Sequence, residues 1–269
     1  MLRPGRNCWQ LAPAGRVAVL IDAAAYFAAV AEAIARAERS VVILSWDVDS
    51  RTSLVGGRPD DPTCRLGGLL NAVLDERPEL QIHVLNWDFA MLYAFEREAL
   101  PLYRREWRAH RRLHFRFDAN HPIGGCHHQK VVVVDDAVAF VGGLDICARR
   151  WDTPRHDAVD PRRMDVGGKP YAPFHDVQIA VDGPAAAALG MLARRRWERA
   201  TGERLAPVVG AGDRWPGSVR PDFADVDVGI ARTIPAGLDA CEVREVETLF
   251  LDAIAAARRT IYVENQYFT

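Results

Sequence analysis

Short runs of β-branched residues and longer segments rich in alanine and leucine alternate along this chain of 269 residues. A short apolar run is typical of a β-strand, whereas apolar residues that recur every three to four positions are typical of a helix. The pattern predicts strands near 17–21, 41–46, 81–86, 113–117, 128–134, 137–142, 177–182, 226–232 and 261–267, and helices near 24–38, 66–76, 184–200 and 243–258. Strands that alternate with helices predict an α/β fold, here a layered α/β/α sandwich with a central mixed β-sheet.

Local signals refine three of these elements. Asp22 precedes the first helix and is a candidate N-cap, and Pro184 suits the first turn of the third helix. Asp135-Asp136-Ala137 lies between two apolar runs, where aspartate favours a turn. We therefore expect residues 128–142 to form a hairpin of adjacent antiparallel strands.

Three segments without periodicity predict long loops, at 51–64, 151–176 and 202–224. The middle loop follows the expected hairpin directly and ends at Phe174-His175-Asp176 before a strand. Loops of this length usually carry function or lack order. Two interpretations stay open for it, a wall facing the substrate or a solvated insertion.

An internal repeat suggests how the chain is organised. Residues 33–43 align with residues 253–263, which lie 220 positions later. Both copies end an alanine-rich helix with an arginine and a hydroxyl residue and continue into a β-branched strand. We predict one domain over 1–240 and the first helix and strand of a second, truncated lobe over 241–269.

His128, Lys130 and Asp135 bring an imidazole, an ammonium and a carboxylate together within eight residues, and Gly142-Gly143 follows. On a strand, residues two apart point to the same face, so one phosphate group could contact both His128 and Lys130. An imidazole with an ordinary pKa of about 6.5 is partly neutral and nucleophilic near neutral pH, and an ammonium stabilises phosphoryl oxygens. The set predicts phosphoryl transfer without a metal or another cofactor. Taken singly, each residue has a plain structural explanation, such as a solvated strand end or a turn.

The choice of lysine at position 130 adds to this argument. Of the 34 Lys and Arg residues, only Lys130 and Lys169 are lysines, so 32 are arginines. Lysine is a compact point charge, whereas arginine is a planar fork. A lysine here indicates a site that requires a small cation.

The arrangement H-x-K-x4-D-x6-G-G-x-D resembles the signature of the phospholipase D superfamily. The resemblance implies that His128 forms a covalent phosphohistidine, that Lys130 binds the phosphate and that Asp135 orders and polarises the catalytic set. Further stretches are similar to the lipid-hydrolysing branch, namely Asn7-Cys8-Trp9, Trp46-Asp47, Pro173-Phe174-His175-Asp176 and Glu264-Asn265-Gln266-Tyr267-Phe268. The resemblance also implies substrate-binding roles for seven residues, namely Gly142, Gly143, Asp145, His175, Asp176, Asn265 and Gln266.

Members of that superfamily use two such motifs, and the second histidine protonates the leaving alcohol and then activates water. Only one motif is present here, and the repeat would place the second histidine near position 348. We expect a lobe that hydrolyses phosphatidyl lipids and is incomplete without a second lobe or a second copy. Two alternatives stay open, a homodimeric single-motif phosphodiesterase that cleaves nucleic acid and a catalytically silent remnant.

Composition and charge narrow the partners and the cellular location that we expect. The net charge of −2 gives no overall attraction to nucleic acid or to anionic membranes, so we disfavour nucleic acid as a partner. Five cysteines without a CxxC pair indicate reduced thiols. The chain begins without an apolar signal segment and contains no stretch long enough to span a membrane. We expect a cytoplasmic protein, with peripheral membrane contact as an option.

Two further clusters attract weaker interpretations. Cys126, His127 and His128 contain potential metal ligands, but neighbours on an extended strand point to opposite faces, so we expect no metal site there. The arginines at 194–196 lie on a predicted helix and are interpreted as a solvated face.

Overall fold

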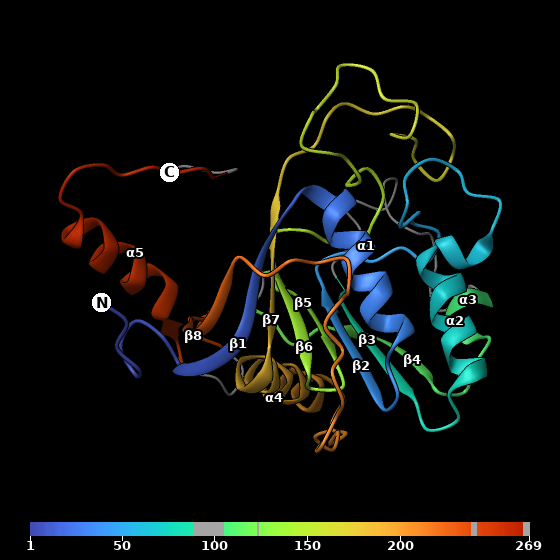
Figure 1. The fold of residues 1–269 in the computed structure, drawn as a ribbon. Helices are drawn as coiled ribbons and strands as arrows, with labels where there is room; N and C mark the ends of the chain where they lie inside the picture. Colours follow the sequence, from blue (N-terminus) through green and yellow to red (C-terminus); the bar gives the residue numbers. More distant parts are fainter. Residues whose placement is uncertain (89–104, 123, 238–240, 266–269) are drawn as a thin grey trace. The chain divides into compact units, whose positions relative to one another are not determined.

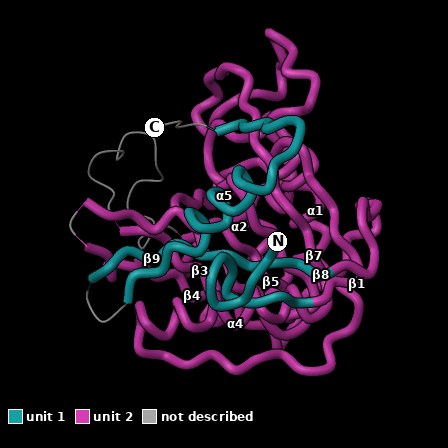
Figure 2. Tube along the Cα trace, turned by 90° about the vertical axis from the view of Figure 1, so that its left-hand side faces the viewer, with its two compact units in different colours: residues 1–12, 227–269 teal, residues 13–226 magenta. Residues whose placement is uncertain are grey.

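The computed structural model describes residues 1–88, 105–122, 124–237 and 241–265 (Figure 1). They form two compact units, Pro13–Val226 and the combination of Met1–Ala12 with Asp227–Thr269 (Figure 2). These units reflect spatial proximity, whereas the predicted division after residue 240 reflects an internal repeat. That division stays a prediction.

The central feature is an eight-stranded sheet in the order β4-β3-β2-β5-β6-β7-β1-β8 (Figure 1). The strands are β1 (Gln10–Ile21), β2 (Ser40–Ser45), β3 (Gln81–Trp87), β4 (Leu113–Asp118), β5 (Lys130–Val134), β6 (Val138–Gly142), β7 (Val177–Asp182) and β8 (Phe223–Ile230). β3 runs parallel to β2 and β4, whereas β5, β6, β7 and β1 follow one another antiparallel. The predicted central mixed sheet is therefore confirmed, and so is the β5–β6 hairpin.

Helices cover both faces of this sheet. The helices of the larger unit are α1 (Asp22–Ala35), α2 (Leu66–Glu76), α3 (Arg105–Arg108) and α4 (Gly183–Thr201), with a short 3-10 turn η1 at Pro62–Cys64. A further helix, α5 (Glu245–Ala256), belongs to the smaller unit. α1 and α2 pack on each other and share a core with Val132 and Val134 of β5. α4 covers the other face, where Trp197 meets the ring of His83 at 4.8 Å. The layered α/β/α prediction is confirmed.

One predicted strand is wrong within the described residues. Residues 261–265 adopt no strand, while 266 and 267 lie outside the described residues. Ile261, Tyr262 and Val263 are exposed, and no described strand pairs with them. A β-branched run needs a partner strand to satisfy its backbone groups, so the local pattern alone was not sufficient.

The predicted cap of the first helix is also wrong, because α1 starts at Asp22 itself. Its N-cap is Ile21, and the Asp22 side chain makes no capping bond. Asp22 has a φ of 65° and is fully buried, so its carboxylate serves the interior instead. Pro184 does lie in the first turn of α4, as predicted.

The smaller unit contains α5 and a two-stranded pair, β9 (Thr233–Ile234) and β10 (Val243–Arg244). Asp252 of α5 accepts hydrogen bonds from Arg6 at 2.9 Å and from Asn7 at 2.7 Å. These bonds attach the N-terminal residues to α5. Among the described residues, no helix combines the length and the hydrophobicity that a membrane span requires.

Candidate active site

Four strand ends meet at one edge of the sheet. β5 runs antiparallel to β2 and pairs Val131 with Leu44, so the start of β5 lies beside the end of β2. β6 pairs Gly142 with Lys130, and β7 pairs Gln178 with Gly142. The start of β5, the ends of β2 and β6 and the start of β7 therefore converge where the hairpin is open.

Lys130 is held firmly at this edge. Its side chain is buried, and its Nζ lies 2.9 Å from the Asp145 carboxylate and donates to the His128 carbonyl oxygen at 3.3 Å. Asp145 is buried as well and accepts the backbone N–H of Trp46 at 3.0 Å. The ion pair fixes an ammonium group next to the backbone of residue 128. β5 begins at Lys130, two residues later than the pattern predicted.

His128 precedes β5 and is exposed to solvent. The edge of the Trp46 ring faces its imidazole at 6.2 Å between centroids, and Trp46 stacks on Trp87 at 5.8 Å. The protein around the ring and then the Lys130 ammonium lower the pKa of His128 below its ordinary value, although Asp145 and Asp176 oppose the shift. The imidazole is therefore predominantly neutral at neutral pH, which is the form that can attack an electrophile.

Two glycines let β7 approach this edge closely. A Cβ on Gly143 would lie 2.1 Å from Oδ1 of Asp176, and one on Gly142 would lie 2.5 Å from the carbonyl oxygen of Val177. Val177 also donates its N–H to Asp176 at 2.7 Å, which fixes that carboxylate. The predicted residues Gly142, Gly143 and Asp176 thus lie together with Lys130 and Asp145.

Residues 33–211 match the family model described as Phospholipase D, which is more than half of the chain. The chain belongs to the phospholipase D family. Phospholipase D A of Dictyostelium discoideum is 26% identical and covers 94% of this chain, and phospholipase D beta 2 of Arabidopsis thaliana is 26% identical and covers 88%. The chain spans only 21% and 34% of the lengths of these two relatives.

Two solved structures also resemble part of the chain. A phospholipase D family member of Salmonella typhimurium, Nuc, is 14% identical, with a TM-score of 0.43, over 68% of this chain and 95% of its own. A phosphatidylserine synthase of Haemophilus influenzae is 14% identical, with a TM-score of 0.45, over 69% of this chain and 38% of its own.

The structure separates the aspartate of the phospholipase D signature from the histidine and the lysine. Asp135 follows β5 at the closed end of the hairpin, on the order of 16 Å from Lys130 at about 3.3 Å per strand residue. Its buried carboxylate accepts backbone N–H groups of Glu38, Arg39 and Ser40 at 2.7–2.8 Å. The Asp135 side chain therefore stabilises the backbone at the closed end of the hairpin and does not contact His128. Its predicted catalytic role stays a prediction.

His175 lies two residues before β7, in a different cluster. Its Nδ1 is 2.7 Å from Oδ1 of Asp22, and Nε2 of His156 is 3.2 Å from Oδ2 of Asp22. One ligand atom from each of the three residues lies within 4.8 Å of the others, a spacing that could hold a metal ion. The long loop 151–176 therefore brings two imidazoles to the buried carboxylate that the sequence suggested as a helix cap.

The two remaining predicted site residues cannot be placed beside His128. Asn265 belongs to the smaller unit, and Gln266 lies outside the described residues. Their substrate-binding roles stay predictions.

The sequence did not indicate the buried ion pair that holds the two neighbours of His128, His127 and Gln129. Buried Asp118, at the end of β4, contacts Nε2 of His127 at 3.2 Å and Nε of Arg196 at 3.0 Å. Burial raises the pKa of Asp118, but contacts with His127 and Arg196 outweigh it and lower this pKa to about 2. Arg196 also donates to Gln129 at 3.0 Å. Arg196 is thus buried rather than solvated, so the solvated-face interpretation was wrong there, and no local pattern indicated this pairing.

Proposed function

We propose that this chain is the phosphohistidine-forming lobe of a phospholipase D that hydrolyses phosphatidyl lipids. The observation that carries the proposal is the fixed ammonium of Lys130, held by Asp145 beside an exposed imidazole whose pKa is lowered. A nitrogen of His128 attacks phosphorus, and the bond from phosphorus to the leaving alcohol oxygen breaks. Lys130 stabilises the negative charge on the phosphoryl oxygens.

The reaction needs a second proton-transferring group. The leaving alkoxide takes a proton from a general acid, and that group, as its conjugate base, then deprotonates the water that cleaves the N–P bond. The resemblance to the phospholipase D superfamily implies that this group is a second histidine. We propose that a second lobe or a second copy of the chain supplies it.

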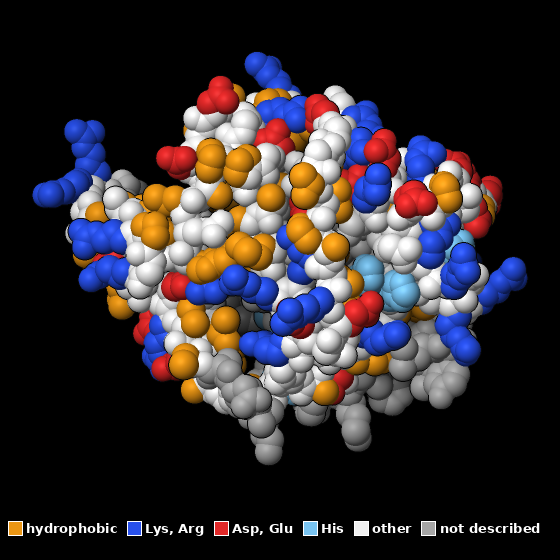
Figure 3. Space-filling model, turned by 90° about the horizontal axis from the view of Figure 1, so that it is seen from below, with side chains coloured by type: hydrophobic (Ala, Val, Ile, Leu, Met, Phe, Trp, Pro, Cys, Tyr) orange, Lys and Arg blue, Asp and Glu red, His pale blue; other side chains and the backbone are white. Residues whose placement is uncertain are grey.

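The lipid assignment is supported by relatives that are named phospholipases D and by the charge of the chain. A net charge of −2 provides no general attraction for a polyanion. Figure 3 shows basic, acidic and hydrophobic side chains interspersed over one face of the molecule. We therefore favour a phosphatidyl lipid, presented at a membrane surface, over nucleic acid.

A phosphodiester with p-nitrophenol as the leaving group tests the first half-reaction alone, because p-nitrophenolate departs without a general acid. We expect phosphatidyl-p-nitrophenol to give one equivalent of p-nitrophenolate per chain in a burst. Intact-mass analysis should show a phosphatidyl adduct, and peptide mapping should place it on His128. Slow turnover after the burst would indicate that the second histidine is missing.

Matched substrates and the mass in solution decide between the alternatives. A burst with thymidine 5′-p-nitrophenyl phosphate but not with the lipid ester would contradict lipid specificity. Full turnover from a dimeric peak on a light-scattering column would show that two copies complete the site. Absence of any adduct with either ester would mean a catalytically silent domain.

A further inference from the structure

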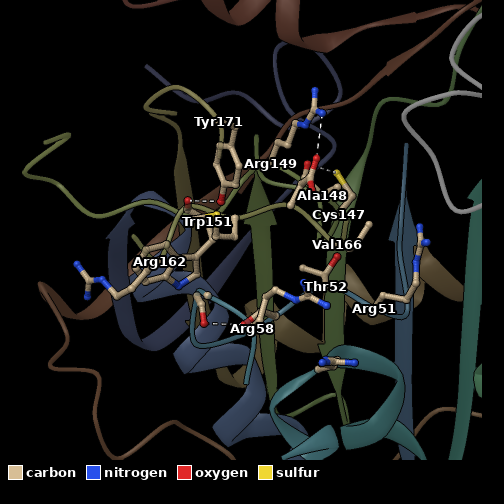
Figure 4. Close-up of a pocket in the computed structure, with 16 residues that line it drawn as sticks. Arg51, Thr52, Arg58, Cys147, Ala148, Arg149, Trp151, Arg162, Val166 and Tyr171 are labelled. Carbon is tan, nitrogen blue, oxygen red and sulfur yellow. Dashed lines mark hydrogen bonds and ion pairs between the residues drawn. The ribbon is translucent and has the colours of Figure 1, made fainter. Parts of the chain in front are cut away.

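A cavity of about 110 Å³ lies between loop 51–65 and loop 147–171 (Figure 4). Five arginines line it, namely Arg51, Arg58, Arg65, Arg149 and Arg162. One acidic residue, Asp165, belongs to the same lining. A cavity of roughly 150 Å³ can hold benzene, so this one suits a small group such as a single oxyanion.

Carboxylates neutralise only part of this positive charge. The ion pairs are Arg51 with Asp49 at 2.7 Å, Arg149 with Asp165 at 3.0 Å and Arg162 with Asp160 at 2.7 Å. Arg65 donates instead to the carbonyl oxygen of Pro59 at 3.1 Å. In the part of the chain that the structure describes, Arg58 has neither an acidic partner nor a hydrogen-bond acceptor. Five arginines against three aspartates leave a net charge of +2.

Polar donors inside the cavity have no partner of their own. Thr52 lines the cavity and is buried, and its hydroxyl has no hydrogen-bond partner among the described residues. In Figure 4 the Arg58 side chain extends toward Thr52 and Val166. A buried hydroxyl without a partner is costly, and an anionic oxygen could accept from both donors.

The cavity is built by contacts between its two loops. Gly57 donates its N–H to the carbonyl oxygen of Arg162 at 2.6 Å. Gly56 has a φ of 77°, and a Cβ there would lie 2.6 Å from the Trp151 ring. The hydroxyl of Tyr171 donates to the Trp151 carbonyl oxygen at 2.7 Å. The arginines are thus presented by a preformed frame, which lowers the entropy cost of binding.

The two loops that line the cavity lie close along the chain to residues of the active site. Asp145, which holds Lys130, is two residues from Cys147 in the cavity lining, so their Cα atoms lie at most about 7.6 Å apart. Trp46, which faces His128, is five residues from Arg51 on the opposite wall. Asp49 joins the two walls by donating its N–H to the Ile146 carbonyl oxygen at 3.1 Å.

We propose that this arginine cavity binds an oxyanion of the lipid headgroup, so that the substrate carries a carboxylate or phosphate in addition to its phosphodiester. The assignment rests on the proposed function. Its chemistry is charge-assisted hydrogen bonding from Arg58, Arg65 and Thr52. A quaternary ammonium headgroup would be repelled by the same arginines.

Calorimetric titration of the chain tests the cavity with inorganic phosphate, glycerophosphoserine and glycerophosphocholine. In a Lys130→Gln background, which removes the phosphate site beside His128, phosphate should still bind. Arg58→Gln should weaken this binding about tenfold and Thr52→Val about threefold. Arg155→Gln, an exposed arginine of the same loop outside the cavity, is the matched control and should change nothing.

In the wild-type chain, glycerophosphoserine should bind at least about tenfold more tightly than glycerophosphocholine, and Arg58→Gln should remove that preference. Phosphate binding that ignores Arg58→Gln would overturn the cavity site. Binding of phosphate through Arg58 without any preference for glycerophosphoserine would mean a free-anion site and would overturn the headgroup assignment. An Arg58-dependent preference for a 5′-phosphorylated dinucleotide over glycerophosphoserine would also overturn that assignment. If Lys130→Gln leaves the affinity for glycerophosphoserine unchanged, the proposed catalytic site fails and the cavity result stands separately.

Discussion

At the open end of the β5–β6 hairpin, His128 is exposed beside one ammonium group, whereas at the closed end Asp135 is buried beneath four hydrogen-bond donors. The fourth donor is Nε of Arg214 at 2.8 Å. The signature residues are close in sequence but occupy two environments. The comparison teaches that a compact motif can combine a chemical site with a structural anchor, because a strand of five residues separates the two.

The largest expected effect is the loss of chemistry at the open end. His128→Asn removes the nucleophile and should reduce the rate of the p-nitrophenolate burst by about 10³-fold or more. Because the side chain is exposed, the free energy of unfolding should change by less than about 0.5 kcal/mol. Burst kinetics and urea unfolding of the same samples measure both quantities. A large stability loss would contradict the separation of the two ends.

Asp135→Asn should have the opposite profile. It removes one of the two carboxylates that pair with the buried Arg214 guanidinium, since Glu38 stays at 2.6 Å, and it weakens three bonds to backbone. We therefore expect a loss of about 2 to 4 kcal/mol in unfolding free energy. The burst per folded chain should stay within about threefold of wild type. A fully folded variant with no burst would instead give Asp135 the catalytic part that the signature implies.

Lys130→Gln should reduce the burst rate by about 10²-fold, because one preorganised donor to the phosphoryl oxygens is lost. Lys130→Arg is the matched variant that keeps the charge. We expect only partial recovery from it, since a planar guanidinium does not fit the position of the ammonium beside Asp145. Equal activity of the arginine variant would show that charge alone suffices.

The smallest effect is a shift in pH dependence. Only neutral His128 attacks, so the burst rate should fall about tenfold per pH unit below its pKa and reach a plateau above it. The surrounding protein and Lys130 lower that pKa, so the midpoint should lie below 6.5. Lys130→Gln removes a positive neighbour and should move the midpoint upward. A wild-type midpoint above 6.5 would contradict this electrostatic account.

The fold was largely predictable because its signals are local. Val131 to Val134 followed by Asp135-Asp136 predicts a strand and a turn, and the structure has both. Lys130 and His128 came together as expected because they are neighbours in sequence. The family resemblance was carried by the same short stretch and by four others along the chain.

Other features depend on partners distant in sequence. Asp22 resembled a helix cap, yet it binds His175 from more than 150 positions away. Arg196 resembled a surface residue, yet it pairs with Asp118. The arginine cavity requires two loops to meet, and periodicity contains no information about that meeting.

Gly142 has a consequence for how this protein can change over generations. Every amino acid that a single base change can introduce at a glycine codon carries a Cβ, and here that atom would meet the Val177 carbonyl oxygen and, at 2.9 Å, the Cα of Gln178. Backbone atoms cannot swing aside as a side chain can. A Cβ at Gly167 would lie 3.3 Å from the Asp165 carboxylate and near no other atom of the described residues, and the φ of Gly167 is ordinary. Position 167 can therefore accept other amino acids. We therefore expect related sequences to accumulate replacements at position 167 and to keep glycine at position 142, where a side chain would push β7 away from β6.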